Sequence, residues 1–447
     1  MTSGKILVVS TSTPLGCLPH TDLQRLVRYL HDRQHSIRID EGYVINREFL
    51  KAGHLPTLLS AFFYFDMSFM VWVLLGALAV QMSADLGLSP AQKGFMVALP
   101  VLAGALLRVV FGILVDRLRP KLAGAIGQVI VIGGLAICWL VGIKTYEGTL
   151  ALGLVLGVAG ASFAVALPLA SRWYPPQFQG TALGIAGAGN SGTVFASLFA
   201  PGLAAIWGWN NVLGLAVLPL TLAFVVYLFA AKNAPTAPPP KKLHEYLAVL
   251  RMGDAWWFMF FYAVTFGGFV GLASSLAIYF NTDYGLNAVQ AGYFTAACVF
   301  CGSLVRPIGG ALADRLGGIK TLSLMYAIAA VALVAVSFHQ PNVYVALAIF
   351  AIGMLAFGMG NGSVFQLVPQ RFRHEIGVMT GLVGMTGGIG GFFLASSLGL
   401  SKQITGNYQA GLLMFASLAV LALIGLTVIK HRWRTTWGAV GIAGARI

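Results

Sequence analysis

The feature that most constrains this chain is a series of twelve apolar segments, each about 20 residues long or longer, which is enough for a helix to cross the hydrocarbon core of a bilayer. Only 9% of the 447 residues are charged and 58% are hydrophobic, whereas a soluble domain carries roughly 25% charged residues. The sequence therefore predicts an all-α integral membrane protein with twelve transmembrane helices. We place these helices at 57–83, 92–116, 121–143, 148–170, 181–205, 209–231, 256–280, 289–313, 319–339, 343–367, 375–400 and 407–430.

The longest connection between helices, 232–255, contains a proline-rich stretch from Ala234 to Lys242. Proline cannot continue a helix, and such a stretch forms a semi-rigid linker. The linker divides the helices six and six, and the sequence leaves the role of the segment before the first helix open. We expect five regions: a cytoplasmic N-terminal extension at 1–56, a six-helix half at 57–231, a cytoplasmic linker at 232–255, a second six-helix half at 256–430 and a cytoplasmic tail at 431–447.

Lysine and arginine are distributed unevenly between the two sides of the predicted bundle. Sixteen of them fall in the linker, the tail and the loops on the side of the termini, and only Lys93, Lys144 and Lys402 fall on the other side. Because basic residues concentrate in cytoplasmic loops, we expect both termini to be cytoplasmic. The net charge of +14 is then a consequence of topology, and we expect no nucleic-acid partner.

The two halves of the chain are related by an internal repeat. Leu106–Leu118 and Leu304–Leu316 share Leu, Arg, Gly, Leu, Asp, Arg and Leu at a constant offset of 198 residues. Each copy begins in the second helix of its half and ends in the following loop. Two pseudo-symmetric six-helix halves imply a central site between them and a rocking motion of one half against the other.

The end of each repeat carries a loop motif. Gly310–Lys320 resembles the loop motif of the major facilitator superfamily, and Gly112–Lys121 is a weaker copy. In that superfamily the motif holds the cytoplasmic ends of helices together, so the resemblance implies a gating role here. Asp116 and Asp314 are suited to accept a helix N-terminus or an arginine. The residues assigned to this gating role are Gly112, Asp116, Arg117, Gly310, Asp314 and Arg315.

Three charged residues fall well inside the predicted helices: Arg108, Arg306 and Asp66. Each charge costs on the order of 2.5–3.5 kcal/mol at the centre of a membrane helix. The two arginines occupy equivalent positions in the two halves, and the planar fork of arginine suits a planar oxyanion. The alternative is that each arginine pairs with a carboxylate or caps helix carbonyls. Two symmetry-related arginines with a single interior acid favour an anionic substrate that offsets their desolvation.

Glycine-rich runs occur at equivalent places in the fifth helix of each half. Gly184–Gly192 lies in the fifth predicted helix and Gly381–Gly391 in the eleventh. Such runs allow close helix packing and let helices slide or bend. Ordinary close packing is the simpler interpretation, and glycine spacing alone leaves function open. The glycines concerned are Gly184, Gly187, Gly189, Gly192, Gly381, Gly384, Gly387 and Gly390.

These features together resemble the nitrate/nitrite porter family, the NarK-type branch of the same superfamily. The resemblance covers residues 57 to about 430, and it rests on the paired arginines, the two glycine-rich signatures and Ala161–Pro168 in the fourth helix. It implies a multi-pass protein of the bacterial inner membrane that transports nitrate and/or nitrite. The implied mechanism is alternating access, as nitrate/nitrite exchange or as proton-coupled nitrate uptake.

The same resemblance implies roles for six residues. Arg108 and Arg306 grip the anion, two aromatic rings enclose it, and a tyrosine and an asparagine donate hydrogen bonds. Gly388 stands where an asparagine is expected in the second signature, and Asn361 is a weaker polar candidate. The remaining implied binding residues are Phe163, Phe266, Tyr262 and Asn190.

The physical chemistry of these residues is consistent with that assignment. Tyr262 and Phe266 are four residues apart and share a helix face, and aromatic walls exclude water and strengthen the attraction between arginine and an anion. The alternatives are that Phe163 packs in the core and that Asn190 makes a helix–helix hydrogen bond. Asp66 either takes up a proton during transport, or it forms a salt bridge or lies near the inner face of the membrane.

Other functions are less consistent with the sequence. A transporter of another small anion, such as formate or a short organic acid, is one alternative, and an anion sensor on a transporter fold is another. The helices show no catalytic triad, metal cluster or phosphate loop, so we expect neither an enzyme nor a metal or other cofactor. Cys298 and Cys301 form a CxxC inside a hydrophobic run, which favours packing over metal binding. We expect a monomer whose partners are a small inorganic anion, the lipid bilayer and, if transport is proton-coupled, protons.

Overall fold

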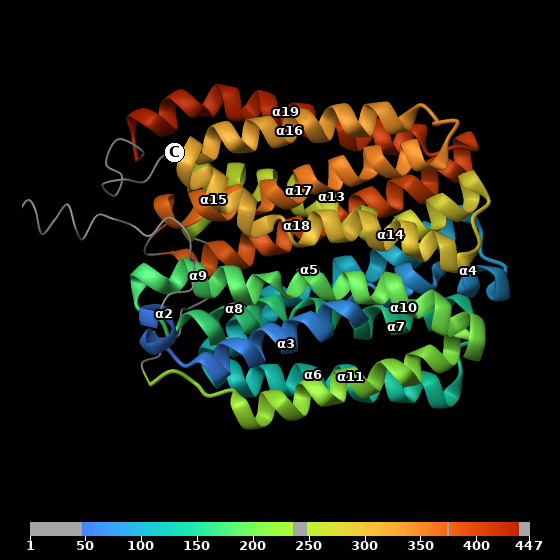
Figure 1. The fold of residues 1–447 in the computed structure, drawn as a ribbon, viewed down its shortest axis with the longest axis horizontal. Coiled ribbons are helices and arrows are strands. Elements are labelled where there is room, and N and C mark those ends of the chain that lie inside the picture. Colours follow the sequence, from blue (N-terminus) through green and yellow to red (C-terminus); the bar gives the residue numbers. More distant parts are fainter. Residues whose placement is uncertain (1–46, 236–247, 373–374, 438–447) are drawn as a thin grey trace, which may run out of the picture. The chain divides into compact units, whose positions relative to one another are not determined.

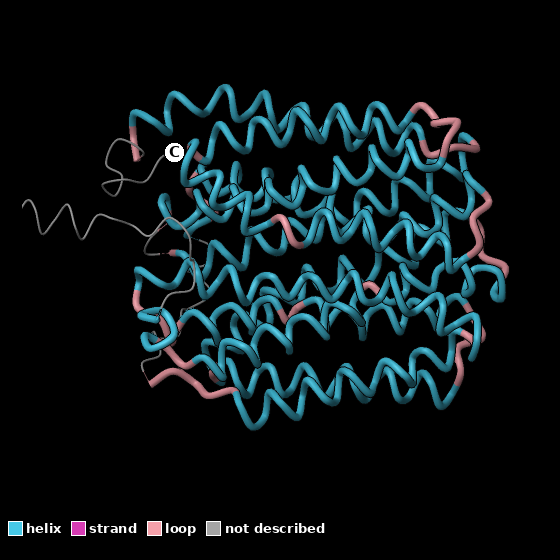
Figure 2. Tube along the Cα trace, in the orientation of Figure 1, coloured by secondary structure: helices cyan, strands magenta, loops and turns pink. Residues whose placement is uncertain are grey.

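The computed structural model describes residues 47–235, 248–372 and 375–437. Residues 51–447 form one compact unit, separate from residues 1–50, and the packing described below lies within 51–447. Most of the predicted N-terminal extension, the middle of the linker and the last ten residues lie outside the described residues. In the described part of the chain every regular element is helical (Figure 2).

Twelve helices long and apolar enough to span a membrane occur among the described residues, and this confirms the predicted all-α membrane fold. The first half comprises α3 (Leu55–Trp72) with α4 (Leu74–Leu86), α5 (Pro90–Leu118), α6 (Pro120–Val141), α7 (Tyr146–Gly160) with α8 (Phe163–Ser171), α9 (Pro176–Gly187) with the 3₁₀-helix η2 (Ala188–Ser191) and α10 (Gly192–Trp207), and α11 (Trp209–Ala230). The second half comprises α13 (Gly253–Tyr284), α14 (Ala288–Ser303) with α15 (Arg306–Leu316), α16 (Gly318–Ser337), α17 (Val343–Arg371), α18 (Ile376–Thr405) and α19 (Gln409–Thr435). A short helix, α2 (Arg47–Ala52), precedes them.

The internal repeat extends to the residues that end and begin helices. Gly87 ends α4 and Gly285 ends α13, each in the left-handed conformation that glycine adopts without strain. Two residues later, Ser89 and Asn287 begin α5 and α14 with a capping box, which satisfies free N–H groups at the helix start. The two glycines, and likewise Ser89 and Asn287, are separated by the 198 residues of the repeat. The same local chemistry therefore forms the connection between the first and second spans of each half.

The two halves occupy the lower and upper parts of Figure 1, coloured blue to green and yellow to red. We call the end of the bundle where α3 begins and α19 ends the terminal end, and the other the opposite end. At the opposite end the halves touch through backbone: a Cβ on Gly94 would lie 2.7 Å from Cα of Gly399, and one on Gly292 would lie 2.7 Å from the carbonyl oxygen of Ser197.

Glycines near the terminal end have a different environment. Gly184 in α9 and Gly381 in α18 have open space where a Cβ would stand. Two hydrogen bonds between the halves agree with this division: one joins Ala91 and Gln403 at the opposite end, and one lies at the centre. The halves therefore meet at the centre and the opposite end, and they are less closely packed at the terminal end.

Candidate anion-binding site

Four of the membrane-spanning helices are interrupted near their middle. If the twelve spans are numbered along the chain, the interruptions lie in span 1 at Val73, between α3 and α4, and in span 4 at 161–162, between α7 and α8. In span 5 the interruption is η2, and in span 8 it lies at 304–305, between α14 and α15. Non-helical backbone at membrane depth is tolerated only where protein buries it or where it lines a cavity. These interruptions lie next to the two interior arginines: Trp72 and Gly160 contact Arg108, and Gly187 faces Arg306.

Arg108 projects from the unbroken helix α5 and is fully buried. Its Nε donates a hydrogen bond to the carbonyl of Gly160 at 3.2 Å, and its Nη1 donates to the carbonyl of Gly384 in the other half. The alternative that Arg108 caps helix carbonyls is therefore correct for two of its nitrogens. Its Nη2 has no hydrogen-bond partner among the described residues, which leaves the two N–H donors of that nitrogen for a ligand.

Three aromatic rings surround the Arg108 guanidinium. Its Cζ lies 5.3 Å from the ring centre of Trp72, 5.0 Å from that of Phe163 and 5.1 Å from that of Phe266. These distances are in the range of cation–π attraction. The structure thus places both predicted aromatic residues at this arginine, together with a tryptophan that the sequence analysis did not find.

Arg306 is the first residue of α15, directly after the interruption in span 8, and it is half-buried. Its Cζ lies 5.0 Å from the ring centre of Phe365. In the part of the chain that is described it forms no ion pair, and its Nη1 is buried without a hydrogen-bond partner. The alternative that Arg306 is neutralised by a carboxylate therefore finds no support.

Aromatic residues connect the two arginines. Tyr262, in α13, lies between the rings that contact the two arginines. Its ring stacks on Phe266 at 5.1 Å and meets Phe365 edge-on at 5.1 Å. Phe163 lies 6.1 Å from Phe365. Phe163 and Phe266 contact Arg108, and Phe365 contacts Arg306. Together with Tyr262 these rings form one cluster around both charges, which we call the aromatic belt of the site.

Two buried asparagines carry amides without hydrogen-bond partners. Asn190 lies in η2 and Asn361 in α17, and both are at most 1% exposed. Neither the oxygen nor the nitrogen of either amide has a partner among the described residues. The helix–helix hydrogen bond considered for Asn190 is absent from that part of the structure, so its amide is available to a ligand.

The second glycine signature makes room for the aromatic belt. A Cβ on Gly384 would lie 3.2 Å from Phe163, and one on Gly387 would lie 2.6 Å from Tyr262. Gly390 packs against the backbone of Ala263, and Gly381 has open space. The absence of side chains in α18 therefore lets these two rings reach the centre.

The first glycine signature packs against the first span. Gly189 and Gly192 contact the backbone of α3, and Gly187 faces Arg306, whose Cζ would lie 4.0 Å from a Cβ there. Gly184 has open space. Span 5 thus packs closely on the first span through its glycines, and this contact positions Asn190 of η2.

Asp66 lies in α3 and is 3% exposed. Its Oδ1 accepts a hydrogen bond from the hydroxyl of Ser191 at 2.6 Å. It forms no ion pair with a described residue, and it lies eleven residues from the start of α3, which is about 16 Å along a helix. The salt bridge that we considered for Asp66 is absent among the described residues, and the distance along α3 favours a position inside the span over one at its end.

The residues of the two loop motifs lie at the terminal end. Asp116 accepts a hydrogen bond from Arg172 at 2.9 Å, and this ion pair joins α5 to the end of α8. Asp314, in the copy that matches the motif better, is exposed and forms no ion pair with a described residue. Arg117 and Arg315 are exposed, and Gly112 and Gly310 are half-buried.

Ion pairs at Asp254 join α13, α17 and α19 at the terminal end of the second half. This carboxylate, in the first turn of α13, accepts a hydrogen bond from Arg371 at 2.6 Å and one from Trp433 at 2.9 Å, and it also pairs with Arg432. This cluster was not predicted from the sequence, because the partners lie 117 to 179 residues from Asp254 along the chain.

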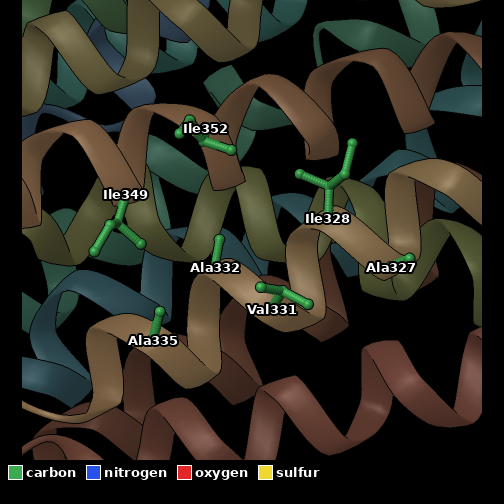
Figure 3. A pocket seen from close by; sticks show the side chains of 7 residues that line it. All are labelled: Ala327, Ile328, Val331, Ala332, Ala335, Ile349 and Ile352. Atoms are coloured by element: carbon green, nitrogen blue, oxygen red, sulfur yellow. The ribbon is translucent and has the colours of Figure 1, made fainter.

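An apolar groove of about 370 Å³ lies on α16 and α17, away from these charges (Figure 3). None of its lining residues belongs to the candidate site. Two of them, Val331 and Ile352, are more than half exposed, as expected of side chains that contact lipid chains in a bilayer. The groove is lined by Ala327, Ile328, Val331, Ala332, Ala335, Ile349 and Ile352.

Known proteins resemble this chain over most of its length. The sequence profile of the Major Facilitator Superfamily matches residues 58–395. A nitrite extrusion protein of Bacillus subtilis (strain 168) is 31% identical, over 82% of this chain and 91% of that protein. A probable nitrate/nitrite transporter, NarK2, of Mycobacterium tuberculosis (strain H37Rv) is 32% identical, over 83% and 95%. A probable nitrate/nitrite antiporter, NarK1, of Thermus thermophilus is 29% identical, over 82% and 90%.

A solved structure shares the fold. It is a bacterial homologue of the human lysosomal transporter Spinster, and the two structures superpose with a TM-score of 0.63. The match covers 84% of this chain and 96% of the other, with 18% sequence identity. At that identity the likeness concerns the fold alone.

Proposed function

Because this chain belongs to the Major Facilitator Superfamily, we propose that its two interior arginines bind nitrate or nitrite and that the protein carries these anions across the membrane by alternating access. Membership of the superfamily confirms the resemblance inferred from the loop motif. Relatives at about 30% identity, over more than four-fifths of this chain, are named as nitrate or nitrite transporters. The two alternatives, a carrier of another small anion and an anion sensor, gain no support from these relatives.

The observation that carries the proposal is the pair of unpartnered guanidinium nitrogens, Nη2 of Arg108 and Nη1 of Arg306. Arginine stays charged and presents N–H groups in a rigid plane that matches a planar oxyanion. The aromatic belt excludes water, which strengthens the attraction between the charges. Nitrate or nitrite bound between the guanidiniums would offset the cost of burying them.

Further residues complete the proposed site. Phe163 and Phe266 cover the anion, and Tyr262 donates a hydrogen bond to it. The amide of Asn190 donates a second, because it is buried at the centre without another partner. We assign no catalytic chemistry to the protein, since carriers of this superfamily move their substrate unchanged.

Alternating access follows from the packing of the halves. They are in contact at the opposite end and loosely packed at the terminal end, so we propose that the anion exchanges with water at the terminal end in this conformation. Closing that end brings the loop motifs together, and the pair of Asp116 with Arg172, which lies within the first half and is present in this conformation, holds the end of α5 for that contact. Gly112, Arg117, Gly310 and Arg315 belong to the same moving contact.

We also propose that the terminal end faces the cytoplasm of a bacterial cell. The described loops at that end contain most of the lysines and arginines, whereas the opposite end contains Lys93, Lys144 and Lys402. Because basic loops remain on the cytoplasmic side, this distribution sets the orientation. Relatives from bacteria favour the plasma membrane.

Flux of labelled nitrate into proteoliposomes tests the function. Vesicles loaded with nitrite should accumulate labelled nitrate by exchange, and vesicles without protein should not. External nitrite should compete, and formate in equal excess should compete weakly. Binding of nitrate without flux would instead indicate a sensor, and equal competition by formate would indicate a less selective anion carrier.

A further inference from the structure

Asp66 is the one acidic residue well inside the spans among the described residues. Burial of an unpaired carboxylate at this depth is costly, and neutralisation by a proton removes that cost. Arg108 and Arg306, the other interior charges, are committed to the proposed anion site. The contacts of Asp66 with span 5 indicate which part of the protein responds to its charge.

The hydrogen-bond donor to Asp66 comes from the junction of η2 and α10. The hydroxyl of Ser191, the last residue of η2, donates to Oδ1 at 2.6 Å, and α10 begins at the next residue, Gly192. A negative charge near a helix start is stabilising. Ionised Asp66 therefore stabilises the interruption in span 5.

No side chain separates the two spans at this junction. A Cβ on Gly189 would lie 2.6 Å from the ring of Phe65 and 3.0 Å from the backbone nitrogen of Asp66, and one on Gly192 would overlap the Asp66 carbonyl. Backbone in direct contact transmits small displacements, because there is no flexible side chain to absorb them. A change in the bonding of Asp66 thus acts directly on η2.

The η2 helix also carries a group of the anion site. Asn190 directly precedes Ser191 and has a buried amide without a partner in the described chain. One turn earlier, Gly187 faces Arg306. In the proposed site, Asp66 contacts η2 at Ser191, and the anion contacts it at the adjacent residue, Asn190.

Other titratable groups near Asp66 do not compensate its charge. The helices packed on α3 are α4, α7, α8, α9, α10 and α11. Their acidic residues, Asp85 in α4 and Glu147 in α7, lie toward the opposite end, and Arg172 after α8 pairs with Asp116. The rings of Tyr64 and Tyr227 contact each other in a tilted arrangement, with their centres 4.7 Å apart.

The interior charges balance when a proton accompanies the anion. Two arginines and ionised Asp66 give the empty centre a net charge of +1. Nitrate alone reduces it to zero, whereas nitrate with a proton on Asp66 restores +1. The empty and the loaded carrier then cross the membrane with the same central charge.

We propose that Asp66 is the proton-binding site of this carrier and that η2 couples its protonation to the binding of the anion at Asn190. On binding the anion, the carboxylate takes a proton from water, one new O–H bond forms, and the hydrogen bond from Ser191 weakens. Release of the anion on the other side returns that proton to water. The inference rests on the proposed function and commits it to nitrate uptake with a proton.

The test uses the full chain in proteoliposomes that contain a trapped pH dye, with the membrane potential clamped at zero. An inward nitrate gradient should acidify the lumen of wild-type vesicles. Asp66→Asn should lose this acidification but still exchange labelled nitrate when nitrate is present on both sides. Glu147→Gln, which removes an exposed carboxylate from the same half, should behave as wild type.

Two outcomes would overturn the proposal. One is wild-type nitrate exchange without any nitrate-dependent acidification, and the other is acidification that persists in Asp66→Asn. Absence of nitrate exchange in the wild type would instead refute the proposed function. Ser191→Ala provides a second variant if Asp66→Asn does not fold: coupled uptake should persist to a higher pH than in the wild type, and an unchanged pH profile would count against the role of Asp66.

Discussion

Replacing Arg306 by lysine keeps the positive charge at the start of α15 but removes the planar fork of N–H donors. The Arg306 guanidinium has an unpartnered Nη1 and no ion pair among the described residues. The substitution should therefore affect the anion more than the fold. A hydrogen bond to a charged group contributes roughly 1.5–3 kcal/mol, so loss of one such bond should weaken nitrate binding by about 10- to 100-fold.

Calorimetric titration of nitrate into purified protein in detergent measures this change. Arg434→Lys, at the exposed end of α19, is the matched control and should bind nitrate as the wild type does. Arg108→Lys provides a contrast, because Arg108 also bonds to the carbonyls of Gly160 and Gly384. That variant should lose thermal stability as well as affinity, whereas Arg306→Lys should unfold within a few degrees of the wild type.

The reasoning would be refuted by wild-type nitrate affinity in Arg306→Lys. A large loss of stability in Arg306→Lys without loss of affinity would also contradict it, because that result would make Arg306 a structural residue. If Arg434→Lys weakened nitrate binding as much as Arg306→Lys does, the geometry of the central guanidinium could not explain the loss of affinity.

Three further predictions concern the aromatic belt, the contact between halves and the start of α3. Phe365→Leu removes the ring beside Arg306 and should weaken nitrate binding by about 2- to 30-fold by calorimetry, whereas the exposed Phe199→Leu should not. Gly292→Leu should overlap Ser197 and Pro201 and slow nitrate exchange about tenfold or more while binding persists, since overpacking costs roughly 1–3 kcal/mol; an unchanged exchange rate would contradict the assigned contact. His54 accepts a hydrogen bond from the N–H of Thr57 at the start of α3, and burial, with Lys232 nearby, lowers the pKa of its imidazole from 6.5. The unfolded chain therefore binds more protons below pH 6.5, and stability should fall as the pH decreases through that range. His54→Asn keeps a capping side chain and should flatten this dependence in thermal unfolding; an identical slope would argue against it.

The helices and their pairing by halves were predictable because apolar length and local capping chemistry determine them. Gly87 and Gly285 end helices, and Ser89 and Asn287 begin the next ones, with residue types that favour these positions in any fold. The interruptions in spans 1 and 4 were not predicted, since an apolar run gives no sign of where its hydrogen bonding changes.

The arginine pair was predictable from the repeat, but its asymmetry was not recognised. Arg108 lies inside a continuous helix, whereas Arg306 begins one. The difference has a sequence signal, because Pro307 follows Arg306 where Val109 follows Arg108, and the residue before a proline disfavours the helical conformation. Attention to that proline would have located the interruption in span 8.

The aromatic residues were predicted in part. Phe365 is four residues after Asn361 in α17, which places both on one helix face, so it was within reach of pattern reasoning. Trp72 was not, since a tryptophan in an apolar run is usual. Its indole N–H donates to the carbonyl of Pro100 at 2.8 Å, and only the fold brings that carbonyl near.

The central claim is that one planar anion is held between Arg108 and Arg306, and a structure determined with bound nitrate tests it most directly. The account predicts density for a planar anion within hydrogen-bond distance of Nη2 of Arg108 and Nη1 of Arg306, covered by Phe163 and Phe266. A nitrate-saturated structure with no density there, or with the anion bound away from both guanidiniums, would contradict it.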